Sequence, residues 1–493
     1  MEQIKDIIQF VKSHTNNIDY NELVKEVSVE YPDVPYLLVR DICSRMIDTT
    51  ITINTTKVYD INFRNWDKIL KIDEINNTDI KIPKKHMKTF KQFKTLYNTP
   101  QPEQRTKDWF DYRYNRITAS DTASAIDTNP YESVESFICK KCDPNFPFLD
   151  NDFVFHGKKY EQIATSLYEH LYNSKVTEFG CVPSDKHLFL GASPDGISSK
   201  STLDYKFNEK LGTMLEIKCP FVREITCKGE IAGGICPYYY YCQVQQQLEC
   251  CDLENCDFIQ CELREYKDRE EYLKDTTHTF KIYEGTEGTE MSPDNTMSKG
   301  YLLQFLPKNY IPRYDGDKPN FQGRFIYPPR LTMTQTMYDE WVLSTLDNWQ
   351  TEMPDIAETF YFDKVLYWKI NIAHTVTIPR DREWFNDVFP ILTETWSKVT
   401  YYREHLEELP LLQTLADKRK AFYKYKSDFS INNFEPNTLF LDSPTKSTEK
   451  KPFIKKSTYS SKPFDKKTFE KKTFEKKIFE KKSVSEECDF IDD

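Results

Sequence analysis

A short apolar run that carries two charged residues constrains this chain more than any other feature. Residues 214–220 read Met-Leu-Glu-Ile-Lys-Cys-Pro, which predicts a buried strand that ends at the proline. Because residues two apart in a strand point to the same face, we expect Glu216 and Lys218 to project together while Ile217 turns into the core. Buried charges are unfavourable unless they are paired or bind a metal ion. The strand therefore marks a candidate functional site.

An acidic residue on the preceding segment can complete such a site. Asp195 lies in a Pro-Asp-Gly turn that follows the apolar stretch 188–190. An aspartate in this position usually reflects turn chemistry alone, and an acid–x–lysine triplet usually belongs to a solvated strand face. In combination, two carboxylates on neighbouring strands supply the oxygen ligands that a hard divalent cation needs. With the Lys218 ammonium beside them, they suit phosphodiester hydrolysis by metal-activated water.

A third carboxylate is a candidate for the same site. Ile163, Leu167 and Leu171 have helical spacing, which predicts an amphipathic helix over residues 160–172. Glu161 is then expected in the first turn, off the apolar stripe. The alternative is a carboxylate that merely complements the helix dipole.

Two further polar groups stand out in the sequence, at Arg113 and at Gln243. Arg113 with Ser120 fits a phosphate, because a guanidinium can bind it through two hydrogen bonds, although a lone arginine is more often a surface charge. Gln243 follows four tyrosines in a predicted helix that mixes aromatic and amide side chains. The alternative there is ordinary packing with a polar surface.

Five motifs occur in order along residues 101–262. They are Trp109-Phe110-Asp111-Tyr112-Arg113 with Ile117-Thr118-Ala119-Ser120, His156-Gly157-Lys158-Lys159-Tyr160-Glu161, Gly191-Ala192-Ser193-Pro194-Asp195-Gly196, Leu215-Glu216-Ile217-Lys218-Cys219-Pro220-Phe221, and Gln243-Val244-Gln245. This segment resembles the YqaJ-type viral recombinase nucleases, which are related to the phage lambda exonuclease within the PD-(D/E)xK superfamily. The resemblance does not extend to residues 1–100 or beyond about residue 275.

The resemblance implies a restriction-endonuclease-like α/β core, with a mixed central sheet flanked by helices. It also implies an essential Mg²⁺, for which Mn²⁺ substitutes, bound by Asp195, Glu216 and the carbonyl of Ile217. Lys218 would position or deprotonate the attacking water, and Glu161 would complete the acidic cluster.

The resemblance implies contacts with DNA as well. Gln243 would contact the scissile region, and a pocket for a 5′-phosphate would be lined by Arg113, Ser120 and Ser193. The family has an arginine shortly after the Glu-x-Lys strand; Arg223 is the candidate, with a spacing that differs by one residue.

The activity implied is that of a metal-dependent exonuclease that digests one strand of linear duplex DNA from a 5′-phosphorylated end. The product would feed single-strand annealing recombination or genome processing in a large DNA virus. The expected partners are double-stranded DNA ends and a single-strand annealing protein, and relatives can form trimers. One alternative is a structure-specific or general endonuclease with the same fold. Another is an inactive DNA-binding or scaffold protein, against which the intact Asp195, Glu216 and Lys218 argue.

The 493 residues are expected to form four parts. They are an N-terminal helical and accessory region (1–100), the nuclease domain (101–275), an accessory domain of unknown role (276–443) and a disordered tail (444–493). Helical spacing predicts a small three-helix unit over residues 1–48. The tail holds 14 lysines and 5 acidic residues between positions 444 and 482. Since the whole chain has a net charge of −11, residues 1–443 are acidic, and DNA binding requires a local basic channel or the lysines of the tail.

The sequence also indicates the cellular compartment in which the protein is expected. No signal peptide and no run of about 18 apolar residues is present, so we expect an intracellular protein without a membrane span, in the host cytoplasm or the virion. The 13 cysteines are then expected to be reduced. A bound zinc ion or iron–sulfur cluster is the alternative, suggested by Cys139-x-x-Cys142 and the cysteines that follow the active-site strand.

Overall fold

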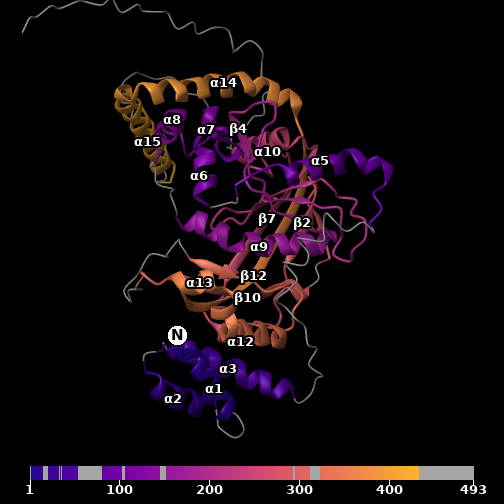
Figure 1. Cartoon of the computed structure of the whole chain (residues 1–493), viewed down its shortest axis with the longest axis vertical. Coiled ribbons are helices and arrows are strands. Elements are labelled where there is room, and N and C mark those ends of the chain that lie inside the picture. The colour runs from indigo at the N-terminus through magenta and orange to yellow at the C-terminus, as the bar shows by residue number, and fades with distance from the viewer. Residues whose placement is uncertain are drawn as a thin grey trace, which may run out of the picture. The chain divides into compact units, whose positions relative to one another are not determined.

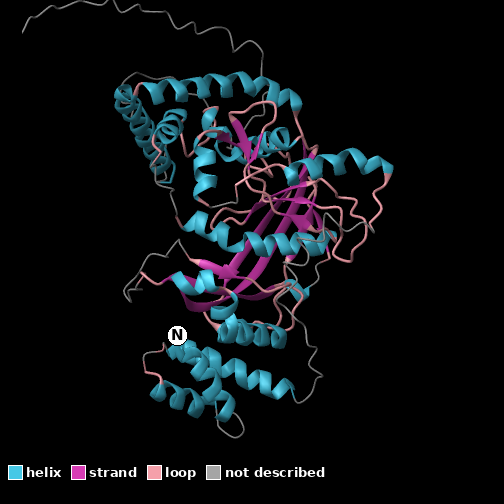
Figure 2. Cartoon of the chain, in the orientation of Figure 1, coloured by secondary structure: helices cyan, strands magenta, loops and turns pink. Residues whose placement is uncertain are grey.

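Figure 1 shows the computed structural model of the chain, and Figure 2 shows its helices and strands. The structure describes residues 2–14, 20–32, 34, 36–53, 80–102, 106–144, 151–292, 295–310 and 323–431. All of them belong to one compact unit that ends at Ile431. The predicted lysine-rich tail lies outside the described residues.

Most described strands join one mixed sheet. Nine strands take part, in the order β11-β10-β12-β7-β6-β5-β2, with β8 and β9 off this path. A second sheet has the order β1-β4-β3. The strands are β1 (Ile117–Thr118), β2 (Val176–Thr177), β3 (Val182–Pro183), β4 (Leu190–Ala192), β5 (Gly196–Ser198), β6 (Met214–Lys218), β7 (Asn255–Glu265), β8 (Lys281–Glu284), β9 (Thr289–Met291), β10 (Lys299–Pro307), β11 (Arg324–Ile326) and β12 (Phe360–Pro379).

Helices surround these sheets. The α-helices are α1 (Glu2–His14), α2 (Tyr20–Glu30), α3 (Tyr36–Ile53), α5 (Met87–Asn98), α6 (Lys107–Tyr114), α7 (Thr122–Ala125), α8 (Val134–Cys142), α9 (Asp152–Tyr172), α10 (Tyr238–Cys251), α11 (Arg269–Lys274), α12 (Gln335–Glu352), α13 (Pro354–Thr359), α14 (Arg382–Glu404) and α15 (Leu409–Ile431). Short 3₁₀ turns are η1 (Lys84–His86), η2 (Ala119–Asp121), η3 (Asn295–Met297) and η4 (Leu406–Glu408). None of the helices in the described ranges is long and apolar enough to cross a bilayer.

The centre of the large sheet combines parallel and antiparallel pairing. β6 and β7 run parallel, whereas β5 pairs with β6 in antiparallel orientation. β12 lies between β7 and β10 and is antiparallel to both. The predicted fold class, an α/β core with a mixed central sheet flanked by helices, is therefore confirmed.

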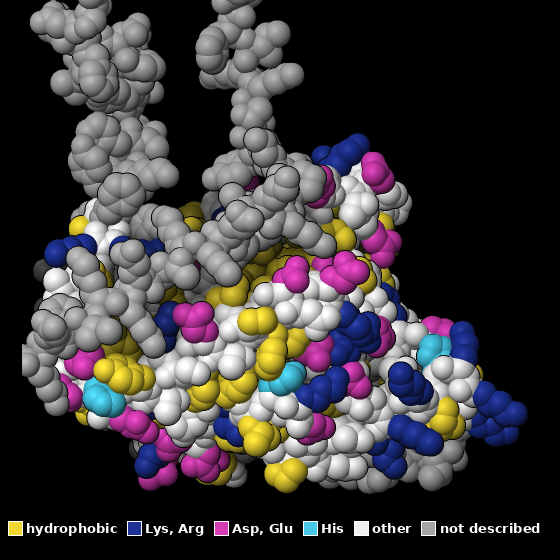
Figure 3. All heavy atoms as spheres, turned by 90° about the horizontal axis from the view of Figure 1, so that it is seen from above, with side chains coloured by type: hydrophobic (Ala, Val, Ile, Leu, Met, Phe, Trp, Pro, Cys, Tyr) yellow, Lys and Arg dark blue, Asp and Glu magenta, His cyan; other side chains and the backbone are white. Residues whose placement is uncertain are grey.

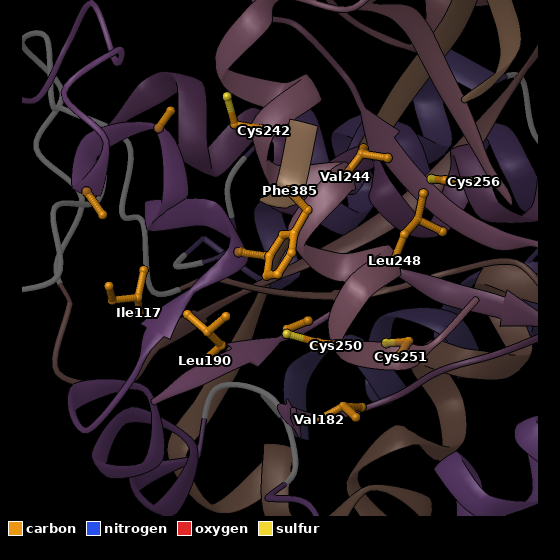
Figure 4. Packing of buried hydrophobic residues seen from close by; sticks show 14 of the residues in the cluster. Ile117, Val182, Leu190, Cys242, Val244, Leu248, Cys250, Cys251, Cys256 and Phe385 are labelled. Carbon is orange, nitrogen blue, oxygen red and sulfur yellow. The ribbon is translucent and has the colours of Figure 1, made fainter. Parts of the chain in front are cut away.

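Two helices cover opposite faces of this sheet at β6. Leu215 and Ile217 pack in the hydrophobic cluster that contains Ile163 of α9. Met214 packs instead in the cluster that contains Val244 of α10, part of which Figure 4 shows. Because successive strand residues alternate between faces, the even-numbered residues of β6 point toward α10.

The N-terminal helical unit is confirmed, and buried charges join it to α12. Arg45 of α3 donates hydrogen bonds to Asp41 Oδ2 and to Asp339 Oδ1 of α12, each 2.9 Å long. Arg269 of α11 donates to Asp339 Oδ2 at 2.7 Å. We call Asp41, Arg45, Arg269 and Asp339 the anchor cluster.

Two details differ from the sequence-based expectations. The helix predicted from residue 160 begins at Asp152, because the side chain of Asn151 caps it by accepting a hydrogen bond from Val154 N at 2.9 Å. Glu161 consequently lies in the middle of α9. The boundary predicted at residue 275 falls inside one sheet, since β10 and β12 come from the predicted accessory domain and β12 pairs with β7.

Candidate metal centre and phosphate pocket

The turn before β5 places Asp195 beside β6. β5 pairs with β6 through Gly196 and Leu215, so Asp195 lies next to the edge of β6 that β5 no longer covers. Its Oδ2 accepts a hydrogen bond from the backbone N–H of Ile217 at 2.7 Å. The N–H and C=O of one strand residue point to the same edge, so the Ile217 carbonyl faces the side on which Asp195 lies.

Glu216 is the most enclosed member of the site, with a side chain that is 0 % exposed. Its Oε1 accepts a hydrogen bond from Gln243 Nε2 at 2.6 Å and also contacts the ammonium of Lys218. Its Oε2 accepts from Gln247 Nε2 at 2.8 Å. The Lys218 ammonium also lies over the ring of Tyr240, 4.6 Å from its centroid. The predicted common direction of Glu216 and Lys218 is thus confirmed, as is the burial of Ile217.

The charges at this site are not balanced. Burial raises the pKa of Asp195 well above its usual value, and the carboxylates of Glu216 and Glu161 raise it further. Burial opposes the charge on Lys218, but Glu216 and Asp195 outweigh that effect and raise the lysine pKa. Two carboxylates share one ammonium here, and the field of Glu161 reaches Asp195 from α9.

This donor set fits a small, hard cation. Among the residues that the structure describes, no group of three or more His, Cys, Asp or Glu side chains is arranged to hold a metal ion. The candidate ligands are therefore the two carboxylates of Asp195 and Glu216 with the Ile217 carbonyl. Mg²⁺ suits such a site, because it binds through one or two carboxylates and retains several waters. A divalent charge would also relieve the repulsion at Asp195.

The cysteines of the described region give no sign of a second metal centre. Cys139 and Cys142 are both buried in α8. Burial raises the pKa of the Cys139 thiol to about 11, which disfavours the thiolate.

Three residues predicted to bind a phosphate lie along one chain of contacts. Arg113 Nη2 donates to Ser120 Oγ at 2.9 Å, and its guanidinium lies 4.3 Å from the ring centroid of Trp109. Trp109 Nε1 donates to Ser193 Oγ at 3.3 Å. Arg113 and Ser193 are partly exposed and Ser120 is exposed, so solvent reaches this group. We call Arg113, Ser120 and Ser193 the phosphate pocket.

Arg223 occupies a different place. Its Nη2 donates to Gln260 Oε1 at 2.7 Å. Gln260 of β7 is the register partner of Lys218. The described contacts of Arg223 therefore lie at the end of β6 that carries Lys218, and they include none with the phosphate pocket.

Gln247 connects the two parts of the site, and the sequence analysis assigned it no role. Besides Glu216, its Nε2 approaches the backbone oxygen of Ser193 at 3.3 Å. Its Oε1 is buried and has no hydrogen-bond partner among the described residues. A signal existed, because Gln247 lies four residues after Gln243 and so on the same face of α10. Tyr240 and Trp109 were missed as site residues because their contacts depend on tertiary packing.

Comparison with known proteins agrees with this geometry. Residues 108–254, which include every predicted site residue, match the family described as the YqaJ-like viral recombinase domain. The uncharacterized protein R354 of Acanthamoeba polyphaga mimivirus is 36 % identical over 321 residues, which are 65 % of this chain and 57 % of that protein. This chain thus spans little more than half the length of that relative.

Two solved structures are also similar. They are LHK-Exo in complex with dAMP and LHK-Exo, an alkaline exonuclease from Laribacter hongkongensis. Each is 16 % identical, with a TM-score of 0.32 over 62 % of this chain and 97 % of the other. The ordered motifs thus lie within residues 108–254, the segment that matches the YqaJ-like viral recombinase domain, and a relative occurs in a large DNA virus.

Proposed function

We propose that this protein is a metal-dependent DNA exonuclease that digests one strand of linear duplex DNA from a 5′-phosphorylated end. One observation carries the proposal. The carboxylates of Asp195 and Glu216 lie around the single ammonium of Lys218, and Asp195 is two residues along the chain from Ser193 of the phosphate pocket. Cleavage next to a terminal phosphate requires a metal site for the scissile bond and, beside it, a pocket for the terminal phosphate. The YqaJ-like domain supports a nuclease of this family.

Each residue has a distinct role in this proposal. Asp195, Glu216 and the Ile217 carbonyl hold Mg²⁺, or Mn²⁺ in its place, which when bound activates water and stabilises developing negative charge. Lys218 positions or deprotonates the attacking water, and Glu161 adds negative charge from α9. Gln243 fixes Glu216 and faces the scissile region.

The phosphate pocket sets the register of the strand. Phosphate contacts position a nucleic acid without reading its sequence, so Arg113, Ser120 and Ser193 determine which bond reaches the metal centre. Digestion would leave a single strand with a 3′ end, the substrate of a single-strand annealing protein. The mimivirus relative supports an origin in a large DNA virus. The proposed role there is in recombination or genome processing, in the host cytoplasm or the virion.

The proposal is tested with one duplex in three forms, in Mg²⁺: linear with 5′-phosphate, linear with 5′-hydroxyl, and closed circular. We expect fast loss of the phosphorylated linear form, slower loss of the hydroxyl form and no loss of the circle. Degradation of the circular duplex would mean that the protein is an endonuclease and not an exonuclease. No loss of any form would leave an inactive DNA-binding or scaffold protein.

Variants of the pocket sharpen this test. Arg113→Ala should reduce the preference for phosphate over hydroxyl ends about tenfold, because a charge-assisted contact is lost. Ser120→Ala should reduce it less, since a hydroxyl gives a weaker bond. Arg382→Ala is the control. Arg382 is the first residue of α14, its side chain is half exposed, and it pairs with Glu254, outside the phosphate pocket. Equal wild-type rates on the two ends would remove the pocket from the mechanism.

A further inference from the structure

The segment 81–98 is strongly basic in an acidic chain. It contains no Asp or Glu and holds six lysines: Lys81, Lys84, Lys85, Lys88, Lys91 and Lys94. The net charge of the whole chain is −11. This segment precedes the residues that match the YqaJ-like domain, and the proposed function assigns it no role.

α5 holds this segment firmly on the nuclease core. Phe93 is 1 % exposed and packs edge to face against Phe179, with ring centroids 5.9 Å apart. Gln92 Nε2 donates to the backbone oxygen of Cys251 at the end of α10, at 2.8 Å. Eight residues of α10 separate Cys251 from Gln243, or about 12 Å at 1.5 Å per residue. The basic helix is therefore fixed with respect to the helix that contacts Glu216.

The outer face of this segment forms a continuous row of charge. Lys84, Lys88, Lys91 and Lys94 are all exposed. Lys88, Lys91 and Lys94 follow one another at intervals of three residues on α5, and Lys84 lies in η1 directly before that helix. We call these four the lysine ridge. Figure 3, which views the molecule from above, shows Lys and Arg side chains gathered at the right-hand side, the side on which α5 lies in Figure 1.

None of the four ridge lysines forms an ion pair with a described carboxylate, although Lys88 contributes to lowering the pKa of Asp252. Within the described ranges, the carboxylate that ion-pairs with this segment is Glu209, which lies 2.8 Å from Lys85, outside the ridge. Other exposed lysines are paired: Lys228 with Glu287, Lys274 with Glu270 and Lys398 with Glu394. These four adjacent ammonium groups have no ion-pair partner among the described residues and repel one another, so a ligand with regularly spaced negative charge would relieve that repulsion.

The chemistry of the ridge favours a polyphosphate over other anionic partners. Protein interfaces are depleted in lysine. A basic amphipathic helix binds membranes by inserting its apolar face, but Phe93 and Leu96 on that face of α5 are buried in the core. The ridge spans ten residues, about 15 Å, along which one strand of a duplex presents about four phosphates.

We propose that the lysine ridge binds the phosphate backbone of duplex DNA, apart from the site at Glu216. This inference rests on the proposed function in taking DNA as the substrate, and it adds a second contact that holds the duplex while its end is processed. It also accounts for DNA binding by an acidic body. The contact is independent of DNA sequence and of the chemistry of the 5′ end.

The test compares two triple variants of the full chain. Lys84→Gln/Lys88→Gln/Lys91→Gln removes three ridge charges. The control, Lys228→Gln/Lys274→Gln/Lys398→Gln, removes the same charge from paired lysines, and such surface pairs contribute little to stability. Binding of a fluorescent duplex of about 30 base pairs is followed by anisotropy in EDTA, between about 50 and 200 mM KCl.

We expect the ridge variant to bind about tenfold more weakly, and the slope of log K against log salt to fall in magnitude by about 2 to 3. The control should match the wild type. Equal affinity and slope in both variants would overturn the inference, even if the wild type digests linear DNA as proposed. If the wild type cleaves nothing but the ridge variant still loses binding, the proposed function fails and the ridge contact stands.

Discussion

Two clusters of buried charge in this protein are built from the same groups but balanced differently. The anchor cluster holds two aspartates and two arginines, and hydrogen bonds link each arginine to an aspartate. At the candidate metal centre, Asp195 and Glu216 share the single ammonium of Lys218.

We propose that this difference separates a structural contact from a catalytic site. In the anchor cluster, charges of opposite sign cancel, and the cluster fastens α3 to α12 without any ligand. At the candidate metal centre, the raised pKa of Asp195 reflects burial and like charge, which Lys218 and the Ile217 N–H offset only in part. Functional sites commonly hold such unfavourable arrangements, and stability is then lower than the fold could provide.

The largest expected effect tests the metal centre. Asp195→Asn should lower the rate of cleavage in Mg²⁺ at least about 10³-fold, because a ligand of the activating cation is lost. Its thermal midpoint without metal should equal or exceed that of the wild type, because a buried like charge is removed. The cleavage rate is measured from the degradation of linear duplex DNA, and the thermal midpoint is measured by circular dichroism. A lowered midpoint would mean that Asp195 is mainly structural.

The converse change tests the anchor cluster. Asp339→Asn leaves Arg45 and Arg269 without their shared carboxylate, and breaking a buried pair in this way costs about 3–5 kcal/mol. The urea midpoint should fall accordingly, while the cleavage rate per folded molecule stays unchanged. Asp347→Asn on the same helix is the control, with a change within about 0.5 kcal/mol. A stable Asp339→Asn protein with reduced cleavage would reverse the roles of the two clusters.

A smaller effect on the cleavage rate is expected at Gln247, which contacts the candidate metal ligand Glu216. Gln247→Ala removes a hydrogen bond to Glu216 and should lower kcat about tenfold with KM for DNA little changed, since a charged hydrogen bond contributes about 1.5–3 kcal/mol. Gln247→Glu should not restore the rate, because it adds a like charge beside Glu216. Gln245→Ala is the matched control, as Gln245 donates instead to the backbone oxygen of Pro379. Equal kcat in the Gln247→Ala and Gln245→Ala proteins would exclude the positioning role.

The sequence was informative where the signal is local. Alternation within residues 214–218 predicted the direction of Glu216 and Lys218, and the Pro-Asp-Gly turn predicted Asp195 beside them. Glu161 was misplaced within its helix because the apolar spacing that begins at Ile163 hides the earlier cap at Asn151. The roles of the phosphate-pocket residues stay predictions, although the structure brings the residues together.

The sequence was silent where the structure depends on distant pairing. β12 lies about a hundred residues beyond β7, and the composition of residues 360–379 does not show which strand it joins. A boundary was therefore predicted at residue 275, inside what is one sheet. The contacts of Gln247 with Glu216 and Ser193 also depend on the packing of α10 against β6, which no local pattern encodes.

The central claim is that a divalent cation balances the excess negative charge of Asp195 and Glu216. Calorimetric titration of the metal-free protein with Mn²⁺ tests it most directly, with Glu216→Gln, which keeps the side-chain shape, and Asp339→Asn as the two comparisons. The account predicts saturable binding to the wild type and to Asp339→Asn, and none to Glu216→Gln over the same concentrations. Identical isotherms for wild type and Glu216→Gln would contradict it.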